Sequence, residues 1–185
     1  MQRNLIGSKP IRRLMTALAM AAAIASLSPA SAQNPTRITD RARFVSVTRN
    51  LEKAPLNPAL KADREWALQW LTDVPDITVT ICADPLGGMV GSGYLHSGEV
   101  LIQYMFSMAA GVIEHPEIAD DKVAQQIAGV ESALAAYRSI IGDKSEPRSP
   151  AIDAILASQA RGELPAFVEQ AYHSCIAKGR EEAGS

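Results

Sequence analysis

Residues 121–142 read DKVAQQIAGVESALAAYRSIIG and carry the strongest structural signal in this chain of 185 residues. Apolar side chains recur there every three or four positions, which places them along one stripe of an α-helix. They are Val123, Ile127, Val130, Leu134, Tyr137 and Ile141. Asp121 suits the positive end of the helix dipole, and Gly142 is a stop signal. Because an apolar stripe of this length would aggregate if exposed, other elements must cover it.

Start and stop signals predict further helices on both sides of this one. The segment Ser97 to His115 is strongly apolar and is expected at the centre of the core. The remaining predicted helices are 40–53, 57–74, 149–162 and 165–179, each opened by Asp, Asn or Pro signals and closed by Pro or Gly. The sequence therefore predicts an all-α single domain of five or six helices.

One segment does not fit a helical pattern. Ile77, Val79 and Ile81 alternate with threonines, which is typical of a strand. Two interpretations stay open: a minor two-stranded β element formed with Phe44 to Thr48, or a buried helical turn over 77–82. An isolated pair of strands is marginally stable, so the helical turn is favoured.

The N-terminal residues have the pattern of an export signal. Residues 1–32 place only positive charge before a weakly apolar run of about fourteen residues, and Ala30-Ser31-Ala32 fits signal peptidase. That run is short for a transmembrane anchor, which needs about twenty residues. We expect a signal peptide at 1–32, a flexible tether at 33–39, the helical domain at 40–179 and a frayed tail at 180–185. The mature protein is then periplasmic or secreted, without a membrane span.

Charge and cysteine usage limit the possible partners. Removing residues 1–32 leaves 14 basic and 20 acidic residues, a net charge of −6, with basic residues interleaved among acids. Nucleic acid is therefore not expected as a partner. In an oxidising compartment, Cys82 and Cys175 are expected to form a structural disulfide. The alternatives are two buried thiols or a redox pair, but the close spacing of a redox pair is absent.

The motifs that would indicate a catalytic or cofactor site fail in detail. Residues 87–93, GGMVGSG, lack the Lys and Ser/Thr of a phosphate-binding loop, because Tyr94 and Leu95 follow instead. A flexible loop is the expected structure. The three histidines, His96, His115 and His173, do not have metal-binding spacing. We assign no catalytic, metal-ligating or cofactor-binding residue and expect no cofactor.

These observations favour a non-enzymatic binding or interaction protein. Its partner is expected to be another protein or a small apolar ligand, held among Trp66, Trp70, Tyr104, Met89, Met105 and Met108. The alternative is a small periplasmic hydrolase-type enzyme with a His/Glu acid–base pair. Glu114 with His115 or with His96 would supply that pair.

Three segments carry a resemblance to other proteins. They are WALQWLTDVPDITVTICADPLG (66–87), VIEHP (112–116) and AGVESALAAY (128–137). In these segments the chain resembles a group of uncharacterised exported bacterial proteins of similar length. The resemblance implies an α-helical periplasmic domain and implies no activity and no site residue.

Overall fold

The computed structural model describes residues 35–183, and over this range the chain is helical and contains no strand. The α-helices are α1 (Pro35–Lys53), α2 (Lys61–Asp73), α3 (Ser97–Glu114), α4 (Lys122–Ile141), α5 (Pro150–Ala160) and α6 (Leu164–Ala183). Short 3-10 helices occur at η1 (Pro58–Leu60), η2 (Asp84–Leu86) and η3 (Pro116–Ile118). The prediction of an all-α fold is confirmed.

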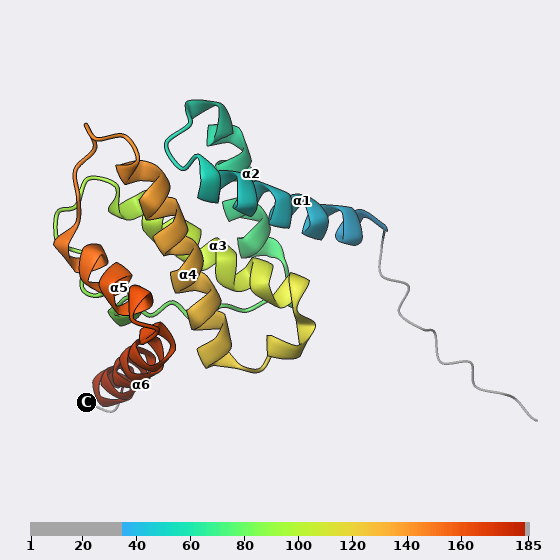
Figure 1. Ribbon diagram of the computed structural model, residues 1–185. Coiled ribbons are helices and arrows are strands. Elements are labelled where there is room, and N and C mark those ends of the chain that lie inside the picture. The colour runs from blue at the N-terminus through green and yellow to red at the C-terminus, as the bar shows by residue number, and fades with distance from the viewer. Residues whose placement is uncertain (1–34, 184–185) are drawn as a thin grey trace, which may run out of the picture. The chain divides into compact units, whose positions relative to one another are not determined.

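Helices α3 and α4 form the centre of this arrangement and pack most extensively against each other (Figure 1). α1 and α2 cover one side of α3, and α5 and α6 pack against α4. Two apolar clusters result. One surrounds Phe44 and Phe106, between α1, α2 and α3. The other surrounds Tyr104, Leu134 and Ile152, between α3, α4 and α5.

The predicted stripe on α4 is buried in its middle and half-buried at its ends. Burial extends well beyond the stripe, because small side chains on α4 let α3 approach closely. A Cβ atom at Gly129 would lie 2.7 Å from Cδ2 of Tyr104 and 2.9 Å from its carbonyl oxygen. Glycine at 129 is therefore required by the contact between the two helices.

The helical region extends beyond both predicted ends. Residues 35–39, expected within a tether, form the start of α1, where Pro35 suits the first turn of a helix. α6 continues past Gly179 to Ala183, although a frayed tail was expected from 180. Glycine commonly ends a helix by adopting a left-handed conformation, but Gly179 does not adopt it and stays helical. The predicted signal peptide at 1–32 lies outside the described residues.

Residues 77–82 form neither the minor β element nor a helical turn, so both interpretations of this segment are wrong. Its proposed partner strand, 44–48, lies within α1. Side chains from the central helices satisfy the backbone of the segment instead. Nε2 of Gln126 donates to the Thr80 carbonyl oxygen at 2.7 Å, and the Tyr104 hydroxyl donates to that of Cys82 at 3.0 Å.

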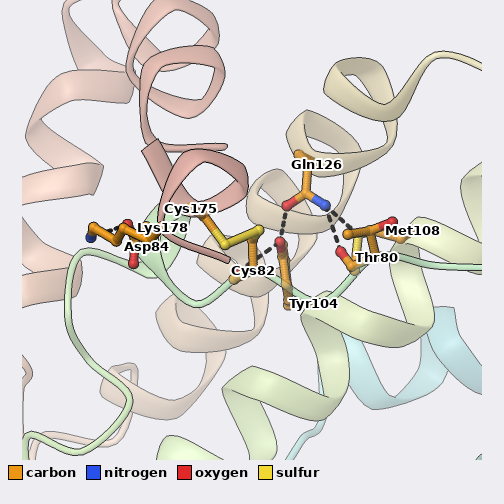
Figure 2. The surroundings of a disulfide bond; sticks show 8 residues. All are labelled: Thr80, Cys82, Asp84, Tyr104, Met108, Gln126, Cys175 and Lys178. Carbon is orange, nitrogen blue, oxygen red and sulfur yellow. Dashed lines mark hydrogen bonds and ion pairs between the residues drawn. A yellow bond between two sulfur atoms is a disulfide. The ribbon is translucent and has the colours of Figure 1, made fainter. Parts of the chain in front are cut away.

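The predicted disulfide between Cys82 and Cys175 is present and ties this segment to α6 (Figure 2). The Tyr104 hydroxyl lies beside it and also donates to Gln126. One turn further along α6, Lys178 pairs with Asp84 of η2 at 2.6 Å. None of the helices in residues 35–183 is long and apolar enough to cross a membrane.

Replacing Gly129 with alanine is expected to destabilise the fold by about 1–3 kcal/mol through overpacking, although alanine is the better helix former. Gly111→Ala is the matched control in the same helix pair. Its Cβ would lie 3.5 Å from Ala128 and Ile118, which is ordinary contact, so its stability should be unchanged or higher. Urea denaturation of both variants measures the difference. Equal midpoints would contradict the close approach at Gly129.

Removing the disulfide with the double variant Cys82→Ala, Cys175→Ala should lower the free energy of unfolding by about 4–5 kcal/mol, because the bond closes a long loop in the unfolded chain. The two residues are separated by 93 positions. Lys178→Ala removes a surface ion pair at the same contact between α6 and η2 and should have a much smaller effect. A double variant that unfolds at the parent's urea midpoint would refute the stabilising role.

Candidate functional site

A cavity with a volume of about 550 Å³ lies between two loops. This volume is within the range of small-molecule sites. We call it the Tyr94 cavity. It is lined by Ser92, Gly93, Tyr94, Leu95, Pro147, Arg148, Ser149, Pro150 and Ala151.

The first wall is the end of the glycine-rich loop. Gly91 and Gly93 have φ angles of +85° and +78°, a left-handed conformation that side chains disfavour. The chain then presents two apolar side chains in different environments. Tyr94 is only 8% exposed, whereas Leu95 is 71% exposed. The glycine-rich loop therefore buries one aromatic ring and leaves a leucine on the surface, and its flexibility stays a prediction.

The second wall is held by the start of α5 and by Tyr137 of α4. The Ser149 hydroxyl accepts a hydrogen bond from the Ile152 amide at 3.4 Å, which caps α5. The Ser149 amide donates to the Tyr137 hydroxyl at 2.8 Å, and that hydroxyl donates to Asp153 at 2.9 Å. Burial raises the pKa of Tyr137. Because these bonds fix the backbone, the position of this wall is set by the core.

A single pair joins the two loops next to the cavity. Nε2 of His96 lies 2.6 Å from a carboxylate oxygen of Glu146, and the His96 side chain is 12% exposed. The ring of His96 also packs edge-on against the Tyr94 ring, with centroids 5.8 Å apart. The pair therefore connects residue 96, just after the first wall, to residue 146, just before the second.

The Tyr94 hydroxyl has an unused capacity to form hydrogen bonds. Within residues 37–183, it is the only buried side-chain polar atom without a hydrogen-bond partner. The pKa of Tyr94 is raised to about 12, chiefly by burial and to a lesser extent by the neighbouring Tyr137, Glu146, Glu99 and Asp153. The hydroxyl is therefore a neutral donor at physiological pH. Leaving such a group unpaired costs about 1–3 kcal/mol.

Arg148 is the only cationic side chain that lines the cavity. Two nitrogens of its guanidinium donate to the Asp153 carboxylate, Nε at 3.0 Å and Nη2 at 2.6 Å. These bonds, with the one from Tyr137, hold the pKa of Asp153 below its usual range. Asp153 therefore stays ionised at neutral pH and compensates the charge of Arg148.

The side chains expected to hold an apolar ligand are not brought together. Trp66 and Trp70 stack on α2 at 6.2 Å, and Arg43 covers the Trp66 ring at 3.8 Å. Tyr104 is fully buried in the other apolar cluster, as are Met89 and Met108. These residues fill two separate parts of the core.

The acid–base pair proposed at Glu114 and His115 is not formed. Arg49 binds the Glu114 carboxylate, while His115 is 64% exposed with Nδ1 3.3 Å from Glu117. Both residues line a polar cavity of about 370 Å³ between α1, α3 and α4. Ser132 lies in this cavity too, and its hydroxyl donates to Glu52. The principal polar groups of this second cavity are thus already paired.

The histidines do not gather into a metal site. His173 is exposed on α6, with Nε2 3.9 Å from Glu169. No group of three or more His, Cys, Asp or Glu side chains in the described part of the chain could hold a metal ion.

Sequence reasoning missed Tyr94, Leu95 and Arg148 as members of one site. The available signals were an apolar pair at the end of a glycine-rich loop and the prolines on both sides of Arg148. Neither signal says that the two loops meet. The contact of His96 with Glu146, fifty positions away, is what shows it.

Comparisons of the chain with models of protein families, with curated proteins and with solved structures find no match.

Tyr94→Phe should leave the melting temperature unchanged or raise it, because it removes a buried hydroxyl that lacks a partner. The matched control is Tyr104→Phe, which removes a hydroxyl bonded to Gln126 and Cys82 and should cost about 1–3 kcal/mol. Thermal unfolding followed by circular dichroism compares them. A clear loss of stability in Tyr94→Phe would show that this hydroxyl has a partner.

Proposed function

We propose that this protein is an exported, non-enzymatic binding protein that holds a small, mostly apolar molecule in the Tyr94 cavity. The observation that carries the proposal is the buried, unpartnered Tyr94 hydroxyl on the ring that lines this cavity. Ligand sites combine apolar walls with a few polar groups that still have hydrogen bonds to make.

The composition of the walls supports an apolar ligand. Tyr94, Leu95, Pro147 and Pro150 are among the lining residues, and Leu95 is largely exposed when no ligand is present. Covering this leucine would remove apolar area from water, which contributes about 25 cal/mol per Å².

The rigidity of the walls also supports binding. The cap at Ser149, its bond to Tyr137 and the pair of His96 with Glu146 hold both loops before any ligand arrives. A preformed site loses little conformational entropy on binding, so more of the contact energy appears as affinity.

Export is the second part of the proposal. Residues 1–32 have the sequence pattern of a signal peptide, and the disulfide between Cys82 and Cys175 fits an oxidising compartment such as the periplasm.

A hydrolase is the rival proposal, and the close pair of His96 with Glu146 is the observation that favours it. Such an enzyme would also need a nucleophile. The serine hydroxyls that line the cavity have backbone partners: Ser92 donates to the Met89 carbonyl, and Ser149 accepts from the Ile152 amide. Binding is therefore the better-supported function. Hydrolysis of p-nitrophenyl acetate by the purified protein, abolished in His96→Ala, would reverse this preference.

An uncharged dye that fluoresces in apolar sites, N-phenyl-1-naphthylamine, should bind the wild-type protein with saturable fluorescence. Leu95→Ser should weaken this binding by about three- to tenfold, because it removes part of an apolar wall. The control Leu68→Ser changes another exposed leucine, on α2 and outside the cavity, and should bind the dye as the parent does.

Two outcomes of this titration would contradict the proposal. Absence of saturable binding would remove the small-molecule site, and equal affinity of the parent and Leu95→Ser would place the dye elsewhere. A protein partner whose binding is lost in Leu95→Ser but kept in Leu68→Ser would replace the small molecule as the occupant.

A further inference from the structure

We propose that the Tyr94 cavity selects uncharged ligands and rejects anions, because its only cationic side chain is already neutralised within the fold. The inference rests on the proposed binding function and specifies the class of ligand. It predicts a small molecule with an apolar body, no negative charge and a hydrogen-bond acceptor such as a carbonyl or ether oxygen.

The geometry of Arg148 carries the first step. An arginine in a ligand cavity ordinarily indicates an anionic partner, because its planar fork matches a carboxylate or phosphate. Here Asp153 already occupies that fork through two hydrogen bonds, at 3.0 Å and 2.6 Å. The N–H groups that these two bonds leave over could still contact an anion, but the positive charge that would attract it is already balanced by Asp153.

Asp153 is itself held firmly in this position. It lies in the first turn of α5, where a carboxylate is stabilised by the positive end of the helix dipole. Its Oδ1 also accepts the Tyr137 hydroxyl at 2.9 Å, and Tyr137 is anchored in the core. Displacement of Asp153 would therefore break three hydrogen bonds, which makes exchange for an incoming anion unfavourable.

The remaining charges near Tyr94 are also unfavourable for an anion. Glu146 lies beside the cavity in its pair with His96, and Glu99 is on the first turn of α3. Glu146 and Glu99 raise the pKa of the Tyr94 hydroxyl, as Asp153 does. A negative ligand would enter a region where the one positive group is compensated and the carboxylates outnumber it.

The Tyr94 hydroxyl supplies the polar part of the selectivity. It is a neutral donor with no acceptor, it belongs to a residue that lines the cavity, and it is the one buried side-chain polar atom without a partner in residues 37–183. A carbonyl or ether oxygen can accept its hydrogen bond without bringing a charge into the carboxylate-rich surroundings.

Two dyes with the same body test the inference on the whole protein. N-phenyl-1-naphthylamine is uncharged, and 8-anilinonaphthalene-1-sulfonate carries a sulfonate on the same anilinonaphthalene frame. We expect the uncharged dye to bind about tenfold or more tightly. Only fluorescence that is reduced in Leu95→Ser is assigned to the cavity. If both dyes bind there equally, the selectivity is refuted and the binding function stands. If neither binds, the binding function itself fails.

A variant that gains affinity for anions tests whether the pairing of Arg148 with Asp153 causes the selectivity. Asp153→Asn frees the charge of Arg148 while its side-chain oxygen can still accept the Tyr137 hydroxyl. The affinity for the sulfonate dye relative to the uncharged dye should rise about two- to fivefold. Glu163→Gln is the matched control, because it frees Arg161 from a comparable ion pair of 2.7 Å away from the cavity, and should leave the ratio unchanged.

A second variant keeps the test decisive if Asp153→Asn is poorly folded. Arg148→Gln leaves Asp153 as an uncompensated carboxylate, so the relative affinity for the sulfonate dye should fall below that of the parent. The proposed role of Arg148 and Asp153 is wrong if the affinity for the sulfonate dye relative to the uncharged dye is unchanged in every one of these two variants that folds.

Discussion

The close approach of α3 and α4 at Gly129 is the contact on which the rest of the fold depends. Tyr104 lies directly against this glycine, and its hydroxyl reaches both Gln126 and the carbonyl of Cys82. The same contact therefore sets the spacing of the central helices and the position of the segment before η2. Because Cys82 carries the disulfide, α6 is held by the same point (Figure 2).

The sequence predicts the helices well, because an apolar period of three and four residues is a local property. The stripe from Val123 to Ile141 and the stop at Gly142 agree with α4. The prediction for the segment from Ile77 to Ile81 was wrong. A strand or a helical turn forms only where other backbone groups provide hydrogen-bond partners for its N–H and C=O groups, and the alternation of side chains does not report whether they do. The acceptor at Thr80 is satisfied by Gln126, 46 positions away, and no local pattern reports such a bond.

The site is less predictable than the fold for the same reason. Composition grouped Trp66, Trp70 and Tyr104 as one apolar site, yet the two tryptophans and the tyrosine pack in separate clusters on different sides of α3. The Tyr94 cavity arises where two loops meet, and neither loop has a motif. Only the disulfide could be paired in advance, because two cysteines allow a single intramolecular connection.

Tyr94 and Tyr104 differ in whether the fold provides a partner for the hydroxyl. Both are buried tyrosines within the same apolar cluster, and burial raises the pKa of each. Tyr104 satisfies its hydroxyl inside the protein and fixes the central helices. Tyr94 leaves its hydroxyl unsatisfied beside a cavity, at a cost that a core anchored by Tyr104 and a disulfide can tolerate. Under the proposed binding function, a ligand would supply the hydrogen-bond partner that residues 37–183 do not give to the Tyr94 hydroxyl.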